Sequence, residues 1–199
     1  MAESTREKFL SVAAKQFAEK GFYGASIASI ATELSLTKQA LLHHFGSKEK
    51  LYAEILQEIS NSNLQRISEI RAQTAEPKDQ LEAVIVGEFE QQYANPVASA
   101  LIMRELLDNE RRAEKAGNWF LKPYLDALVD IVIAADVAAA KTRPEALALV
   151  YQLLGAAMYL PVSVPTLSKM YGKRTFEELR AGYSSELRRL VQSRLHTRD

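Results

Sequence analysis

Two short amphipathic segments lie within residues 26–45, separated by only two residues, and this spacing constrains the fold more than any other feature. In residues 26–34, apolar side chains recur at the i, i+3, i+4 and i+7 positions of one helix face. Ser35-Leu36 form the break, and the second segment covers residues 37–45. A longer amphipathic helix, residues 4–20, precedes them. Two short helices joined by a tight turn and braced by a third predict a helix-turn-helix unit.

Residues that begin and end helices divide the chain into about nine helices, and we expect an all-α fold. Capping-box spacing predicts three helix starts, and Gly21 is expected to end the first helix in a left-handed conformation. Pro123 falls inside the seventh expected helix and should kink it. The capping boxes are Ser4–Glu7, Thr142–Glu145 and Thr175–Glu178, and the later breaks are Pro77, Asn95-Pro96, Gly117-Asn118, Thr142-Arg143-Pro144 and Gly172.

Charge is distributed unevenly, although the 25 basic and 25 acidic side chains balance overall. Residues 1–50 carry 7 basic and 5 acidic side chains, and residues 111–199 carry 14 basic and 9 acidic ones. Residues 51–110 carry only 4 basic against 11 acidic side chains. Because the acidic middle repels phosphate, contact with nucleic acid is expected at one end. We therefore expect a helix-turn-helix domain at residues 1–47 and a second helical domain at residues 48–199.

Several function classes are disfavoured by what the sequence lacks. There is no cysteine, no glycine-rich phosphate loop and no plausible Ser-His-Asp set, so a helical enzyme is an unfavourable alternative and no cofactor is expected. His43 and His44 point about 100° apart on a helix and cannot share a metal ion. No uninterrupted apolar run reaches the length of a membrane span, and Met1–Lys8 is unlike a signal peptide. We expect a soluble cytoplasmic protein.

The second short helix presents two different faces. Leu36, Leu41 and Phe45 are expected on the buried face, opposite the side chains of Lys38 and Gln39, which can reach base edges. His43 shares this outward face, and Thr37 lies at its N-terminal end. Ser26, Ser47 and Lys48 are placed at helix starts that can hold phosphate. The alternative is that this outward face is simply solvated.

The whole stretch from Ser26 to Leu51 resembles the N-terminal domain of the TetR family of regulators. The matching residues are Ser26, Ile30-Ala31, Leu34, Leu41, His44-Phe45, Lys48 and Leu51, preceded by Phe17-Ala18-Glu19-Lys20-Gly21-Phe22. Two positions depart from the family pattern, because Ser35 replaces a turn glycine and Leu42 replaces a tyrosine that reaches phosphate. Together, resemblance and residue types predict DNA contacts by Ser26, Thr37, Lys38, Gln39, Ala40, Leu42, His43, His44, Ser47 and Lys48.

The last two expected helices, from Pro144 to about Met170 and the one that follows the break at Gly172 with its cap at Thr175, carry the strongest indication of self-association. The first is apolar almost all round and the second is amphipathic. The resemblance implies that they pair with their copies in a homodimer, which suits a palindromic operator in double-stranded DNA. The alternative is that both helices belong to an ordinary intrachain core.

The resemblance also implies a pocket for a small, largely apolar effector in the second domain. The candidate contacts are Phe89, Tyr93, Met103, Arg104, Trp119, Phe120, Tyr124, Tyr151 and Tyr159. Side chains of this kind at helical spacing also suit a plain core. The expected function is a transcription regulator, a repressor released from its operator by the effector. The alternative is a similar DNA-binding protein without a ligand, controlled by a protein partner.

Overall fold

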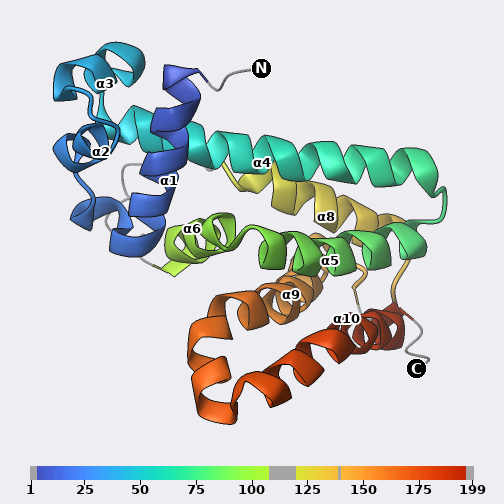
Figure 1. Ribbon diagram of the computed structural model, residues 1–199. Coiled ribbons are helices and arrows are strands. Elements are labelled where there is room, and N and C mark those ends of the chain that lie inside the picture. Colours follow the sequence, from blue (N-terminus) through green and yellow to red (C-terminus); the bar gives the residue numbers. More distant parts are fainter. Residues whose placement is uncertain (1–3, 108–119, 139, 196–199) are drawn as a thin grey trace. The chain divides into compact units, whose positions relative to one another are not determined.

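The computed structural model describes residues 4–107, 120–138 and 140–195, which form nine helices and no strand (Figure 1). The all-α prediction is confirmed. The expected break at Gly117-Asn118 lies outside the described residues. The helices are α1 (Thr5–Gly24), α2 (Ile27–Glu33), α3 (Lys38–Phe45), α4 (Lys48–Gln73), α5 (Pro77–Ala94), α6 (Pro96–Leu107), α8 (Lys122–Ala134), α9 (Arg143–Tyr171) and α10 (Lys173–Leu195).

The chain divides into two compact units, and the division differs from the boundary expected after residue 47. The N-terminal unit comprises Met1–Asn61 and Val97–Leu121, and the C-terminal unit comprises Ser62–Pro96 and Lys122–Asp199. Helix α4 therefore contributes its first half to one unit and its second half to the other. Sequence spacing did not reveal this, because nothing in the local pattern shows where a continuous helix changes its packing partners.

Local hydrogen bonds confirm two of the three expected capping boxes. Ser4 Oγ accepts from the backbone N–H of Glu7, whose carboxylate accepts from the Ser4 backbone at 2.7 Å. Thr142 and Glu145 repeat the pattern at the start of α9. The third expectation was wrong, because α10 already begins at Lys173 and Thr175 lies within its first turn. Gly172, with φ 79°, ends α9 immediately before it.

Glycine and proline positions confirm one expectation and correct another. Gly21 interrupts α1 with φ 71°, as its place after the first amphipathic stretch predicts. Pro123 does not kink a helix, because α8 begins at Lys122. A proline in the first turn loses no intrahelical hydrogen bond, since the N–H it lacks has no partner there. Conversely, Pro161 and Pro165 lie inside α9, which the sequence analysis did not anticipate.

The N-terminal unit closes around one apolar core. Phe9, Ala13 and Phe17 of α1 are fully buried against side chains of α2 and α3. Leu51, Tyr52, Ile55 and Leu56 of α4 and Leu101 of α6 belong to the same cluster. Three helices of this size bury too little apolar surface for a stable domain. The helix-turn-helix therefore depends on residues from α4 and α6.

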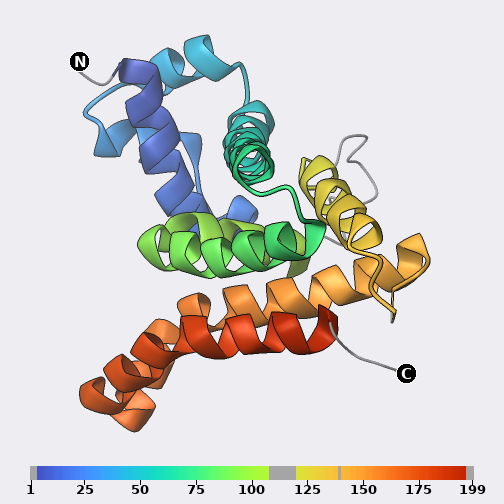
Figure 2. The ribbon, with the colours of Figure 1, turned by 90° about the vertical axis from the view of Figure 1, so that its right-hand side faces the viewer.

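Helix α9 is central to the C-terminal unit, and its own chain covers only part of its apolar surface. It packs against α5, α8 and α10, and Figures 1 and 2 show α10 running beside it. Leu149, Val150 and Leu153 face this interior. Tyr151 and Tyr159 are 50% and 68% exposed on the opposite face. One uncharged face of α9 therefore remains uncovered in the single chain.

By length and composition α9 is the one helix, among the described residues, that is apolar enough to cross a membrane. Its best 18-residue window has a mean hydropathy of 1.7. Gln152 and Ser163 interrupt its sequence, so no uninterrupted apolar run of that length is present. Within the structure 44% of the window is buried.

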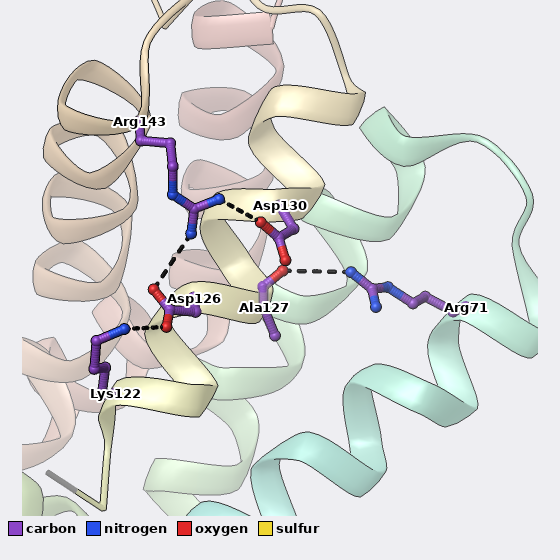
Figure 3. Close-up of polar contacts among 6 residues, drawn as sticks. All are labelled: Arg71, Lys122, Asp126, Ala127, Asp130 and Arg143. Carbon is purple, nitrogen blue, oxygen red and sulfur yellow. Dashed lines mark hydrogen bonds and ion pairs between the residues drawn. The ribbon is translucent and has the colours of Figure 1, made fainter. Parts of the chain in front are cut away.

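An ionic network joins the start of α9 to α8 (Figure 3). Arg143 contacts Asp130 at 2.7 Å and Asp126 at 3.3 Å, and Lys122 pairs with Asp126 from one turn earlier. The hydrogen bond from Lys122 lowers the pKa of Asp126. Arg71 of α4 donates to the Ala127 carbonyl at 3.4 Å in the same region. These groups are exposed, so we expect the network to fix geometry and to contribute little stability.

Ser35 should be a site of backbone strain, because its φ of 55° lies in the left-handed region. We expect Ser35→Gly to raise the free energy of unfolding by about 1 kcal/mol, measured by urea denaturation. Ser11→Gly, at an exposed position inside α1, is the matched control and should lower it by about 0.5 kcal/mol. Equal effects of the two substitutions would contradict strain at Ser35.

Candidate nucleic-acid interface

The turn between α2 and α3 is held by short-range hydrogen bonds. Ser26 Oγ accepts from the N–H of Ser29 at 3.0 Å and begins α2, and Thr37 Oγ1 accepts from Ala40 at 3.1 Å and begins α3. The N–H groups of Ser35 and Leu36 donate back into the last turn of α2 at 2.9 Å. Ser26 and Thr37 therefore lie where the sequence placed them, as the caps of two helices joined by a tight turn.

Helix α3 presents one buried and one exposed face. Leu41 is fully buried and Phe45 is 5% exposed. The expectation that Leu36 shares this face was wrong, because Leu36 precedes the helix and is 38% exposed. Leu42 packs against the edge of the core, and Ala40 is half-buried beside it. The exposed residues of this segment are Thr37, Lys38, Gln39, His43 and His44.

Contacts from α1 and α4 hold α3 in place. Gln16 Nε2 donates to Glu33 at 2.7 Å and ties α1 to the end of α2. The guanidinium of Arg6 pairs with Glu54 of α4 and lies 5.2 Å from the centre of the Phe45 ring. His44 packs its ring 5.7 Å from that of Phe9. Exposed side chains of α3 therefore project from a fixed backbone.

The start of α4 carries the remaining predicted contacts. Ser47 Oγ accepts from the N–H of Lys50 at 3.2 Å, so Ser47 caps this helix. Lys48 Nζ lies 4.6 Å from the centre of the Phe22 ring, within the range of a cation–π contact. Partial burial lowers the pKa of Lys48. Lys50 is exposed in the same turn and is a further candidate cation that was not among the predicted contacts, although it lies within the Ser26–Leu51 stretch.

Helix α6 is tied to α1 and α4 by three hydrogen bonds. Arg104 donates from Nε to the Ala18 carbonyl at 2.8 Å and from a terminal nitrogen to the Glu19 carbonyl at 3.1 Å. Buried Glu105 accepts a hydrogen bond from Tyr52 Oη at 3.0 Å. Arg104, a predicted ligand contact, here donates to carbonyl groups of α1. Because the partners in these hydrogen bonds lie 53 to 86 residues apart in the sequence, no local pattern predicts the contacts.

The residues predicted to bind an effector are divided between the two units. Phe89 and Tyr93 face α10. The ring centres of Phe89 and Tyr183 are 4.9 Å apart, and Arg180 Cζ lies 4.0 Å from the centre of the Tyr93 ring. Half-buried Met103 and Phe120 belong, with Arg104, to the N-terminal unit. Trp119 lies outside the described residues. Tyr124 is buried in the C-terminal unit, whereas Tyr151 and Tyr159 are exposed on α9.

Comparison with known proteins agrees with this local geometry. The family model for bacterial regulatory proteins of the tetR family matches residues 9–55. The chain carries the N-terminal domain of the TetR family. A transcriptional repressor from Pseudomonas putida, NicS, is 29% identical over 117 residues, which are 59% of this chain and 55% of that protein. The repressor KstR2 of Rhodococcus jostii is 32% identical over 53% of each chain. The matched region thus spans about half the length of these relatives.

Solved structures extend the TetR-like fold to almost the whole chain. The regulator FadR from Bacillus subtilis, in complex with stearoyl-CoA, superposes with a TM-score of 0.72 at 19% identity over 95% of this chain and 98% of that one. A transcriptional regulator from Streptomyces coelicolor gives 0.68 at 22% identity over 95% and 97%. At these identities the likeness establishes the fold alone.

Removing the hydroxyl that meets Glu105 should destabilise the N-terminal unit. We expect Tyr52→Phe to lower the free energy of unfolding by about 1–3 kcal/mol, because a buried carboxylate loses a donor. Tyr23→Phe is the matched control, since Tyr23 is 64% exposed, and should change stability little. Urea denaturation followed by circular dichroism measures both. A Tyr52→Phe variant as stable as the control would show that the contact contributes nothing.

Proposed function

We propose that this TetR-family chain is a DNA-binding transcriptional repressor that acts in the cytoplasm and reads a palindromic operator. The observation that carries the proposal is the exposed face of α3, where Lys38, Gln39 and His43 project from a helix whose opposite side is anchored in the core. Lysine and glutamine suit base edges in the major groove. Ser26, Ser47 and Lys48 flank that face at helix starts, where phosphate contacts fix the register of the protein on DNA.

A homodimer formed through α9 and α10 supports this mode of reading. The outward face of α9 carries Leu147, Tyr151 and Tyr159, and its exposed positions from Leu147 to Val162 hold no charged side chain. On α10, Leu179 and Leu190 are 45% and 40% exposed. An apolar face of this extent favours a second copy as its partner. Two recognition helices related by a twofold axis then match two half-sites.

Release from the operator by a small, largely apolar effector completes the proposal. The C-terminal unit supplies buried helices that can surround such a molecule, and a structural neighbour was solved with stearoyl-CoA. The competing candidate is a DNA-binding regulator without a small-molecule ligand that a protein partner controls. A screen for compounds that raise the melting temperature separates the two, because a ligand that binds the native state stabilises it.

Two substitutions should affect DNA binding in different ways. Gln39→Ala should relax the preference at one base pair of each half-site, at a cost of about 1–3 kcal/mol, because it removes a base contact. Lys48→Ala should weaken binding to all sequences and lower the salt slope by about one, because it removes a phosphate contact. Selection from random DNA gives the motif, and fluorescence anisotropy at several salt concentrations gives the slope.

The control for these variants is Gln73→Ala, at an exposed position in the last turn of α4. It should leave both the selected motif and the salt slope unchanged. A motif that is not palindromic would contradict twofold reading. A Gln39→Ala variant that selects the wild-type motif would remove Gln39 from base reading.

Charges introduced on the two faces of α9 should separate dimerisation from folding. Tyr159→Arg places a charge on the exposed face and should yield a folded monomer in light scattering, with its helical circular dichroism retained. Leu154→Arg buries the charge in the chain's own core, since Leu154 is 7% exposed, and should unfold the protein. Leu107→Arg, at a 75% exposed position of α6, is the control and should remain dimeric. A wild-type monomer at micromolar concentration would contradict the dimer.

A further inference from the structure

A cluster of polar side chains is buried within the otherwise apolar C-terminal unit. Glu88 of α5 is 1% exposed and accepts hydrogen bonds from Tyr124 Oη of α8, at 2.9 Å, and from Gln92 Nε2. Arg66 of α4 lies 4.0 Å from the same carboxylate and donates to the Gly87 carbonyl at 3.4 Å. Burial beside Glu88 raises the pKa of Tyr124 well above its usual value, so its hydroxyl remains a donor. Three helices thus place polar groups together at a cost in desolvation.

One group in this cluster is not satisfied. Asn63 of α4 is 5% exposed, and its Oδ1 accepts from Arg66 at 2.7 Å. This bond fixes the orientation of the amide, since the reverse orientation would set two donors against each other. Asn63 Nδ2 consequently faces away from Arg66 and has no hydrogen-bond partner among the described residues. A buried donor without an acceptor is costly, and so it marks a position where an acceptor would bind favourably.

Charge balance in the cluster restricts what that acceptor can be. Arg66 and Glu88 are the two charged members, and together they are neutral. A carboxylate brought to Asn63 would add a second negative charge to a buried site that holds one cation, which is unfavourable at low dielectric constant. A carbonyl oxygen would satisfy Nδ2 without disturbing the balance. Around the cluster, Ile67, Val84 and Leu128 of the same three helices are buried, so the rest of the molecule should be apolar.

Resting on the proposed function, we infer that the effector is a neutral, mostly apolar carbonyl compound whose oxygen accepts a hydrogen bond from Asn63 Nδ2. Arg66 and Glu88 position Asn63 through the contacts described above. Tyr124 holds Glu88 in place from α8 and is the member of the earlier predicted set that belongs to this site.

Isothermal titration calorimetry on the full chain tests the inference with methyl ketones from hexanone to dodecanone and with decanoate. We expect at least one ketone to bind more tightly than decanoate. Asn63→Leu, which has a similar shape but no donor, should weaken ketone binding about tenfold. Asn61→Leu, at an exposed position of the same helix, is the matched control and should bind the ketone as wild type does. Melting temperatures of all variants confirm that each is folded.

Three results would overturn the inference: no ketone in the series binds, decanoate binds as tightly as the best ketone, or Asn63→Leu retains wild-type affinity. The wild-type comparison of ketone with decanoate remains decisive if the Asn63→Leu variant fails to fold. Binding of the selected operator by the same preparations, without ketone, separates this test from the proposed function. If the wild type binds the operator but no ketone, the ligand inference alone is contradicted. If the wild type does not bind the operator, the proposed function is contradicted.

Discussion

Burial of Phe9, Phe17 and Leu41 depends on residues that lie well beyond the helix-turn-helix in the sequence. Leu51 and Leu56 of α4 complete this core, and α6 adds Leu101. A unit of three short helices exposes too much of its apolar surface to be stable alone. Packing of α3 therefore depends on the first half of α4, a helix whose second half belongs to the C-terminal unit.

The parts of the fold that sequence analysis predicted correctly are those decided within a few residues. Ser4, Ser26, Thr37 and Thr142 cap helices through bonds to the N–H three residues later. Such bonds depend on local backbone geometry and can be read from spacing. Thr175 has the same spacing but lies inside α10, because Gly172 already separates the two helices. A capping pattern therefore starts a helix only where no earlier break has already started it.

The parts that sequence analysis missed depend on distant partners. The sequence pattern gave Arg104 as a candidate ligand contact, and only the fold shows that it donates to the α1 carbonyl of Ala18 while its neighbour Glu105 accepts from Tyr52. Tyr151 and Tyr159 appeared as ligand contacts, although α9 turns them outward. Aromatic residues at helical spacing look alike whether they line a core, a ligand site or a surface for a second chain. Their roles depend on whether the helices packed nearby cover the face on which they lie.

Two prolines interrupt the backbone hydrogen bonds in the second half of α9. Pro161 and Pro165 each remove a backbone donor, so two carbonyls in successive turns lose their usual partners. Ser163 Oγ donates to the Tyr159 carbonyl at 2.7 Å, and Tyr183 of α10 donates to the Ala156 carbonyl at 2.7 Å. These side-chain donors meet carbonyls next to the interruption rather than those of Ala157 and Pro161, which lose their usual donors. Figure 2 shows the helix changing direction in its second half. Both prolines lie in the second half of α9, so the bend that they cause is confined to that half. The first half keeps the regular helix that packs against α5 and α8, and its exposed face remains available to a second chain.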